Sequence, residues 1–132
     1  MKIKPKKTKR KNIRKQLEQS IHKVMRDICL IHEPICVTCR GRHNSQILQA
    51  GHLISARLRS TRFDLLNVHT QCRICNSIHR YHPEIYYNWF VQTYGAEELN
   101  LLVKQSKKPF KYSLEELKDI LQKYKKILAE AK

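Results

Sequence analysis

Two pairs of cysteines with the same internal spacing constrain the fold of this chain more than any other feature. Cys36 and Cys39 form one C-x2-C pair, and Cys72 and Cys75 form a second pair after 32 intervening residues. Each pair can place two thiolates in a tight turn, and four thiolates complete the tetrahedral shell of a structural Zn²⁺ ion. A redox dithiol would need only one pair. We therefore predict a structural zinc that joins two distant parts of the chain.

The size and composition of the chain fit one small domain rather than a fibrous or membrane protein. Its 132 residues are 41% hydrophobic and include only 3 Gly and 4 Pro, which excludes collagen-like and low-complexity classes. No apolar run approaches the ~18 residues of a membrane span, and the basic N-terminus leads into no apolar signal segment. We expect a cytoplasmic location without membrane contact. Thiols stay reduced there and serve metals rather than disulfides.

Positive charge is concentrated at the N-terminus. The chain has 27 Lys and Arg against 11 Asp and Glu, a net charge of +16, and nine of the cations lie in residues 1–15 without any acid. This pattern is typical of a protein that binds a polyanion through phosphate contacts. We expect residues 1–15 to be a disordered nucleic-acid-binding arm, with Lys9, Arg10 and Lys11 as DNA contacts, followed by one domain over residues 16–132. The alternative is a solubilising tail.

The spacing of apolar residues predicts a mixed α+β fold. Helices are expected over residues 16–32, 83–94, 97–104 and 114–131, the last after a capping box of Ser113 and Glu116. The apolar stripe of the first helix includes Cys29, which we interpret as a buried small side chain. In the helix over residues 83–94, Ile85, Trp89 and Phe90 are expected in the core. Two short strands at residues 47–48 and 53–54 are expected around Gly51, followed by an Arg-rich loop over residues 57–62.

Polar residues between and beside the cysteine pairs form a recognisable motif. The elements Cys36-x2-Cys39, Gly51-His52, Asn67-Val68-His69, Gln71-Cys72 and Cys75-Asn76 resemble the HNH (His-Me finger) endonucleases, and most closely the lambdoid phage NinG (Rap) and Ref-type recombination nucleases. The resemblance covers roughly residues 21–95. It implies a small zinc-stapled ββα-metal core over about residues 36–94, in which two antiparallel strands lead into a helix that begins near Asn76, flanked by C-terminal helices over about residues 97–131.

The resemblance also implies an activity and three catalytic residues. Neutral His52 would accept a proton from the water that attacks the scissile phosphorus. Asn67 would hydrogen-bond the backbone of the hairpin and hold the imidazole in place. Asn76 would bind a divalent cation that stabilises charge on the phosphoryl and leaving oxygens. The implied products carry a 5′ phosphate and a 3′ hydroxyl, and the implied substrate is branched or recombination-intermediate DNA in a phage or prophage context.

The sequence departs from the HNH pattern at one metal ligand. Many HNH enzymes place Asp directly before the base histidine, whereas this chain has Gly51. The catalytic metal site would then be formed around His52 and Asn76, with His79 and His82 as further ligands or, alternatively, as solvated histidines. Mg²⁺ prefers oxygen, so coordination by histidine would favour Mn²⁺ or Zn²⁺ over Mg²⁺. His69 is a further candidate for a ligand or phosphate contact.

The expected partner is DNA held mainly through its backbone. Arg57, Arg59 and Arg62 form a basic loop near the predicted site and are expected to contact phosphates rather than read bases. Charge alone leaves RNA open. Resolution of a two-stranded junction would favour a homodimer, and host or phage recombination proteins are further expected partners. The alternative function is a non-catalytic zinc-finger nucleic-acid-binding protein. A RING-like domain is disfavoured because two zinc sites need about eight ligands.

Overall fold

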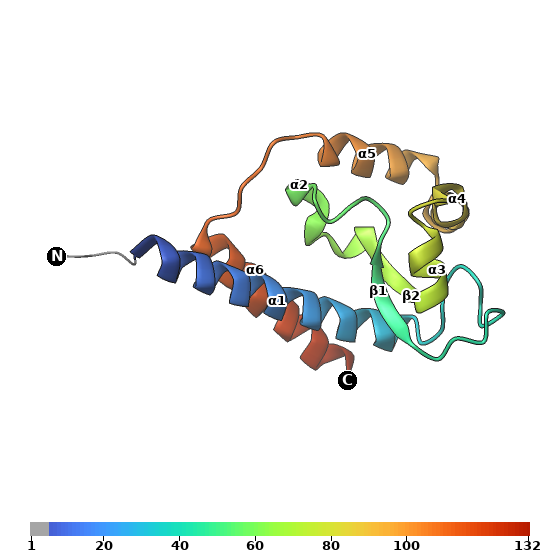
Figure 1. Cartoon of the computed structure of the whole chain (residues 1–132), viewed down its shortest axis with the longest axis horizontal. Coiled ribbons are helices and arrows are strands. Elements are labelled where there is room, and N and C mark those ends of the chain that lie inside the picture. The colour runs from blue at the N-terminus through green and yellow to red at the C-terminus, as the bar shows by residue number, and fades with distance from the viewer. Residues whose placement is uncertain (1–5) are drawn as a thin grey trace.

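Six α-helices and one pair of strands make up residues 6–132, the part of the chain that the computed structural model describes (Figure 1). In chain order they are α1 (Lys6–His32), β1 (Leu48–His52), α2 (Arg59–Arg62), a short 3-10 helix η1 (Leu65–Asn67), β2 (Val68–Cys72), α3 (Arg73–Ile78), α4 (Pro83–Tyr94), α5 (Ala96–Ser106) and α6 (Leu114–Ala131). The expected α+β class is confirmed. None of the helices in this described part is long and apolar enough to cross a membrane.

The first helix begins ten residues earlier than predicted. Residues 6–15, expected to belong to a disordered arm, form the first turns of α1, whereas residues 1–5 lie outside the described part of the chain. Lys and Arg are good helix formers, and residues 6–33 contain no Gly or Pro. The cations Lys9, Arg10 and Lys11 are therefore presented on a helix, where they are exposed to solvent.

The two strands form an antiparallel ladder in which His52 pairs with Val68 and Gly51 pairs with His69. The predicted strand at Leu53 and Ile54 is wrong, because both residues are buried in the connection that follows β1. Two adjacent apolar residues are typical of a short strand, but the strand that pairs with β1 is β2. The connection also contains α2 where an Arg-rich loop was expected.

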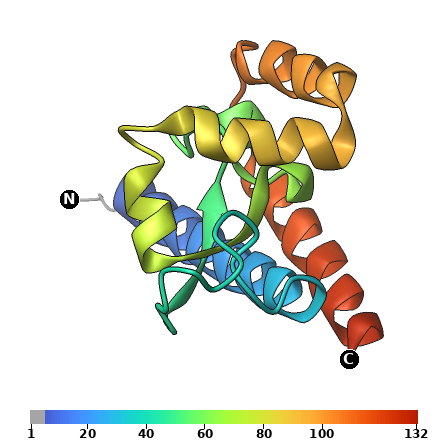
Figure 2. The same ribbon diagram turned by 90° about the vertical axis from the view of Figure 1, so that its right-hand side faces the viewer.

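Helices cover the strand pair on its two sides (Figures 1 and 2). On one side α1 and α6 lie side by side, and Ile21, Met25 and Leu117 pack with Val68 of β2. On the other side α4 and α5 enclose a second cluster that contains Leu53, Tyr86, Phe90 and Leu102. The strand pair is thus held between two helical layers.

The predicted C-terminal helices are confirmed in their main features. Gly95 ends α4 with φ of 98°, a backbone conformation that favours glycine. The capping box of Ser113 and Glu116 is present at the start of α6. Phe90 is fully buried as expected, but Ile85 is 47% exposed, so its predicted place in the core is wrong. Ile85 lies in the first turn of α4.

Candidate metal centre and active site

The four cysteines of the two C-x2-C pairs meet in one buried cluster. Their Sγ atoms all lie within 4.8 Å of one another, and the Sγ atoms of Cys39 and Cys72 are 3.8 Å apart. Four sulfurs at the Zn–S distance of about 2.3 Å in a tetrahedron would be about 3.8 Å apart. The cluster therefore has the composition, burial and spacing of a structural zinc site.

Local backbone geometry prepares these sulfurs for a metal. The N–H of Cys39 points to Sγ of Cys36 at 3.5 Å, and the N–H of Cys75 points to Sγ of Cys72 at 3.4 Å, where Cys72 is the N-cap of α3. Burial works to raise the pKa of Cys36, but hydrogen bonds from Cys39 and Thr38 outweigh it and lower that pKa to about 6. This favours the thiolate, which is the form that binds zinc.

The fifth cysteine stays outside the metal cluster. Cys29 is buried on α1, and its Sγ donates a hydrogen bond to the carbonyl of Val68 at 3.3 Å. Burial raises its pKa to about 12. The interpretation of Cys29 as a buried small side chain is therefore confirmed.

His52, the last residue of β1, has a fixed ring orientation. Its Nε2 lies 2.9 Å from the carbonyl oxygen of Arg62. A carbonyl can only accept a hydrogen bond, so Nε2 carries the ring proton and Nδ1 holds a free lone pair. Burial lowers the pKa of His52; the hydrogen bond to Arg62 works in the opposite direction and the charge of Arg62 adds to the lowering. His52 is therefore a neutral imidazole at neutral pH.

His52 lines a groove between α1 and β1 with a volume of about 380 Å³. The opposite wall is basic, because His22, Lys23 and Arg26 of α1 also line it, and Lys23 and Arg26 are exposed to solvent. Gln49 lines the same groove from β1. A neutral imidazole beside two exposed cations is an arrangement that can hold a phosphate next to a proton acceptor.

Asn67 fixes the chain immediately after His52. Its Oδ1 accepts a hydrogen bond from the N–H of Ile54 at 2.8 Å, and its Nδ2 donates to the carbonyls of Ile54 at 3.0 Å and Thr61 at 3.1 Å. The side chain is fully buried. Asn67 therefore ties the start of the connection after β1 to α2.

Asn76 lies against β1 from α3. Its Nδ2 donates to Oε1 of Gln49 at 2.8 Å, and its Oδ1 lies 3.0 Å from the position that a Cβ at Gly51 would occupy. Asn67 thus contacts the segment that follows His52 in the chain, and Asn76 lies beside Gly51, which precedes His52.

The comparisons with known proteins agree with the motif. The family model described as bacteriophage lambda NinG protein matches residues 1–132. This chain belongs to the NinG family. No curated protein and no solved structure matches it.

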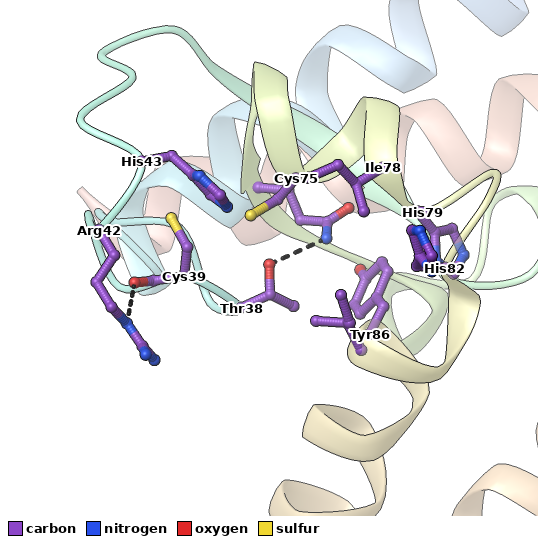
Figure 3. A pocket seen from close by; sticks show the side chains of 11 residues that line it. Thr38, Cys39, Arg42, His43, Cys75, Ile78, His79, His82 and Tyr86 are labelled. Atoms are coloured by element: carbon purple, nitrogen blue, oxygen red, sulfur yellow. Dashed lines mark hydrogen bonds between the residues drawn. The ribbon is translucent and has the colours of Figure 1, made fainter.

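His79 and His82 of this NinG-family chain occupy different environments. Both line a pocket of about 300 Å³ beside the cysteine cluster (Figure 3). His79 donates from Nε2 to the carbonyl of Leu53 at 2.8 Å, and its Nδ1 is buried without a hydrogen-bond partner among the described residues. His82 is exposed, and its Nδ1 lies 3.4 Å from a carboxylate oxygen of Glu84. Asn76 is hydrogen-bonded to Gln49 and to neither histidine, so their coordination of a catalytic metal stays a prediction.

His69, a candidate for a ligand or phosphate contact, has both ring nitrogens in contact with oxygen atoms of the protein. It is 4% exposed, its Nδ1 lies 2.8 Å from a carboxylate oxygen of Glu33, and its Nε2 lies 2.7 Å from the carbonyl of Leu66. The second carboxylate oxygen of Glu33 accepts from the N–H of Thr70 at 3.0 Å. Both ring nitrogens are thus used to join the end of α1 to β2.

Some of the side chains predicted to contact DNA are exposed to solvent, and one is held by contacts within the protein. Arg57 and Arg59 are exposed, as are Lys9, Arg10 and Lys11 on α1. In contrast, Nε of Arg62 donates to Nε2 of His22 at 3.2 Å, and its guanidinium lies 3.7 Å from Glu18. Arg62 is therefore engaged with other residues of the protein, and a phosphate contact by its side chain stays a prediction.

The groove contains residues that sequence reasoning missed. The sequence motif assigns no role to four of them: His22, Lys23, Arg26 and Gln49. On α1, His22 and Lys23 follow the buried Ile21, and Arg26 follows the buried Met25. These α1 residues lie next to the apolar stripe in the sequence. That position could have predicted that they border the element that packs against α1.

Proposed function

We propose that this chain is a divalent-metal-dependent HNH-type endonuclease that hydrolyses DNA phosphodiester bonds. The observation that carries the proposal is the state of His52: a neutral imidazole, oriented by the Arg62 carbonyl, in a groove with exposed cations. The hydrogen bonds of Asn67 and the position of Asn76 beside Gly51 support it.

In the proposed reaction, His52 acts as the general base through Nδ1. It takes a proton from a water molecule as the water oxygen forms a bond to phosphorus and the bond from phosphorus to the 3′ oxygen breaks. The leaving 3′ oxygen takes a proton from solvent, which gives a 5′ phosphate and a 3′ hydroxyl. The hydrogen bond from Nε2 to Arg62 keeps the free lone pair on Nδ1 throughout the approach of the substrate.

The chain offers distinct donor sets for two metals. The four cysteines would hold the structural zinc. Asn76 would bind the catalytic cation, Mg²⁺ or Mn²⁺, through its side-chain oxygen, since its Nδ2 is used by Gln49. When bound, that cation would neutralise charge on the phosphoryl oxygens and the leaving oxygen.

The charge of the groove supports DNA as the substrate. Lys23 and Arg26 line it, and the exposed basic residues of the N-terminal half of α1 continue on the same helix. Such contacts hold the backbone and select shape rather than base sequence. We propose branched or recombination-intermediate DNA as the substrate, cut by a homodimer with paired active sites.

A nicking assay tests the activity. Zinc-loaded protein is expected to nick supercoiled DNA with Mg²⁺ or Mn²⁺ and to stop in EDTA. His52→Ala should lose at least about 10²-fold in rate while it retains zinc and DNA affinity. His32→Ala, a change at an exposed histidine at the end of α1, is the control and should cut normally. Metal-independent or absent cutting by a well-folded protein would favour the alternative, a non-catalytic zinc-finger nucleic-acid-binding protein.

A second assay tests the substrate class. Junction, flap and linear DNA of matched sequence are compared under single-turnover conditions. The proposal expects faster cutting of the junction or flap than of the linear duplex. Equal rates on all three would remove the branched-DNA proposal and leave the nuclease proposal in place.

A further inference from the structure

Gly51 stands where the HNH pattern has a metal-binding Asp, and the side-chain amide of Gln71 reaches into the space that a side chain at position 51 would take. A Cβ at this position would overlap Oε1 of Gln71 and would lie 3.0 Å from Oδ1 of Asn76. Neither Gly41 nor Gly95 has a comparable neighbour; both have positive φ angles instead. At Gly51, therefore, a side chain would have to displace the amide of Gln71, whereas the backbone conformation sets no such requirement.

The Gln71 side chain is held in place but incompletely satisfied. It is 1% exposed, and its Nε2 donates to Oγ1 of Thr38 at 3.3 Å (Figure 3). Its Oε1 is buried and accepts no hydrogen bond from any residue that the structure describes. A buried carbonyl oxygen without a partner is costly, so this oxygen is an acceptor available to a water molecule or a cation.

Oδ1 of Asn76 lies near the same point beside Gly51 as Oε1 of Gln71. Its Nδ2 is used by Gln49, while its Oδ1 lies with Oε1 of Gln71 around the position of the absent Cβ. Amide oxygens are ligands that Mg²⁺ and Mn²⁺ accept readily. Gly51 directly precedes His52 in β1, and Gln49, the partner of Asn76, lines the groove that contains His52, so the oxygen pair lies one residue along β1 from the proposed base.

We propose that Oε1 of Gln71 and Oδ1 of Asn76 together bind the catalytic divalent cation, with Gln71 replacing the carboxylate that is missing at position 51. The catalytic role of this site rests on the proposed nuclease function, but cation binding can be measured without DNA and without cutting. Two neutral ligands bind a divalent cation more weakly than a carboxylate does. Water and phosphate oxygens of the DNA would complete the shell.

Rotation of the Gln71 amide offers a competing explanation that makes the opposite prediction. With the amide turned over, its NH₂ group would point toward Oδ1 of Asn76 and donate a hydrogen bond, and no cation would be needed. Gln71→Glu separates the two arrangements. A carboxylate strengthens a cation site, but it cannot donate to Asn76 and would repel its oxygen.

The test measures the affinity of the zinc-loaded full chain for Mn²⁺ by electron paramagnetic resonance, without DNA. Gln71→Glu should bind Mn²⁺ about tenfold more tightly than the natural chain, and Gln71→Leu about tenfold more weakly. Gln122→Glu, which adds the same charge at an exposed position of α6, should leave the affinity unchanged. Unchanged, weaker or undetectable binding in Gln71→Glu would overturn the proposal. Normal Mn²⁺ binding with no DNA cutting would instead contradict the nuclease function.

A second pair of variants tests the site through stability. Gly51→Asp alone should collide with the Gln71 amide and lower the melting temperature. Gly51→Asp combined with Gln71→Ala should recover much of that loss and bind Mn²⁺ more tightly than Gln71→Ala alone. If the double variant binds no more Mn²⁺ than Gln71→Ala, the place beside Gly51 is not a cation site and the proposal fails.

Discussion

Arg62 holds His52 through its backbone and His22 through its side chain. The carbonyl oxygen of Arg62 accepts from Nε2 of His52 at 2.9 Å, and its Nε donates to Nε2 of His22 at 3.2 Å. The two imidazole rings lie edge to face with centroids 5.5 Å apart. Because Arg62 accepts from one ring and donates to the other, the two histidines have different tautomers and different chemical roles.

The tautomer and pKa of His52 predict how cutting depends on pH. Burial lowers the pKa of His52 below its usual 6.5, and only the neutral ring can accept a proton. The single-turnover nicking rate should therefore be constant from about pH 7 upward and fall by about tenfold per pH unit well below the pKa. A rate that rises on acidification between pH 7 and 5 would contradict His52 as the base.

The pKa of His22 predicts a pH dependence of stability. Burial, with smaller electrostatic contributions from His52 and Arg62, lowers this pKa from 6.5 to about 4. Between those values the unfolded chain binds more protons than the folded one, so stability falls as pH drops from 6.5 toward 4. After allowance for solvent screening of this half-buried ring, the loss is about 2 kcal/mol. His22→Gln keeps an acceptor for Arg62 but does not titrate, and urea unfolding should show a smaller loss on acidification for this variant.

Local patterns in the sequence predicted the metal cluster and the later helices well. The C-x2-C spacing identified Cys36, Cys39, Cys72 and Cys75, and the capping box located the start of α6, because both depend on residues a few positions apart. The partner of β1 could not be found in this way. It lies beyond a 15-residue connection, and only the family resemblance indicated strands that carry His52 and Asn67.

Zinc binding should distinguish the cluster from the fifth cysteine. Cys75→Ser removes a ligand from a cluster that joins the loop after α1 to β2 and α3, so the variant should lose bound zinc and cooperative unfolding. Cys29→Ala is the matched control, since it removes a buried thiol outside the cluster. It should retain one zinc per chain, measured by metal analysis. Equal zinc content in the two variants would contradict the four-cysteine site.

Asn67→Asp should be destabilising because two of its hydrogen bonds need an amide donor. The carboxylate could still accept from Ile54, but it would face the carbonyls of Ile54 and Thr61 without a proton to donate. We expect a loss of about 2–4 kcal/mol in the free energy of unfolding. Asn88→Asp, on the exposed face of α4, should change it by less than about 0.5 kcal/mol. Urea titration checks both values; similar small losses would contradict the positioning role of Asn67.

Charged residues were the hardest to assign because their partners are distant in sequence. In the sequence Arg62 is typical of a phosphate contact, but in the folded chain its side chain contacts Glu18 and His22. His69 is likewise a candidate ligand in the sequence, but in the structure its Nδ1 lies 2.8 Å from a carboxylate oxygen of Glu33. For Lys23 the sequence offers too little indication of a role, because it is one of 27 Lys and Arg residues. Its position in the groove depends on how α1 packs against β1.

Lys23 and Arg26 should account for part of the salt dependence of DNA binding. Each phosphate contact that is removed lowers the slope of log K against log salt concentration by about one. Lys23→Gln with Arg26→Gln should therefore lower the slope by about two and slow cutting. The contact of Arg26 with Asp27, 3.8 Å away at the surface, is too weak to hold Arg26 back from DNA. Lys125→Gln with Lys126→Gln makes the same charge change on exposed residues of α6 and should leave cutting unchanged. If the two double variants bind DNA with the same slope in fluorescence titrations from 50 to about 300 mM salt, the phosphate lies elsewhere than the groove between α1 and β1.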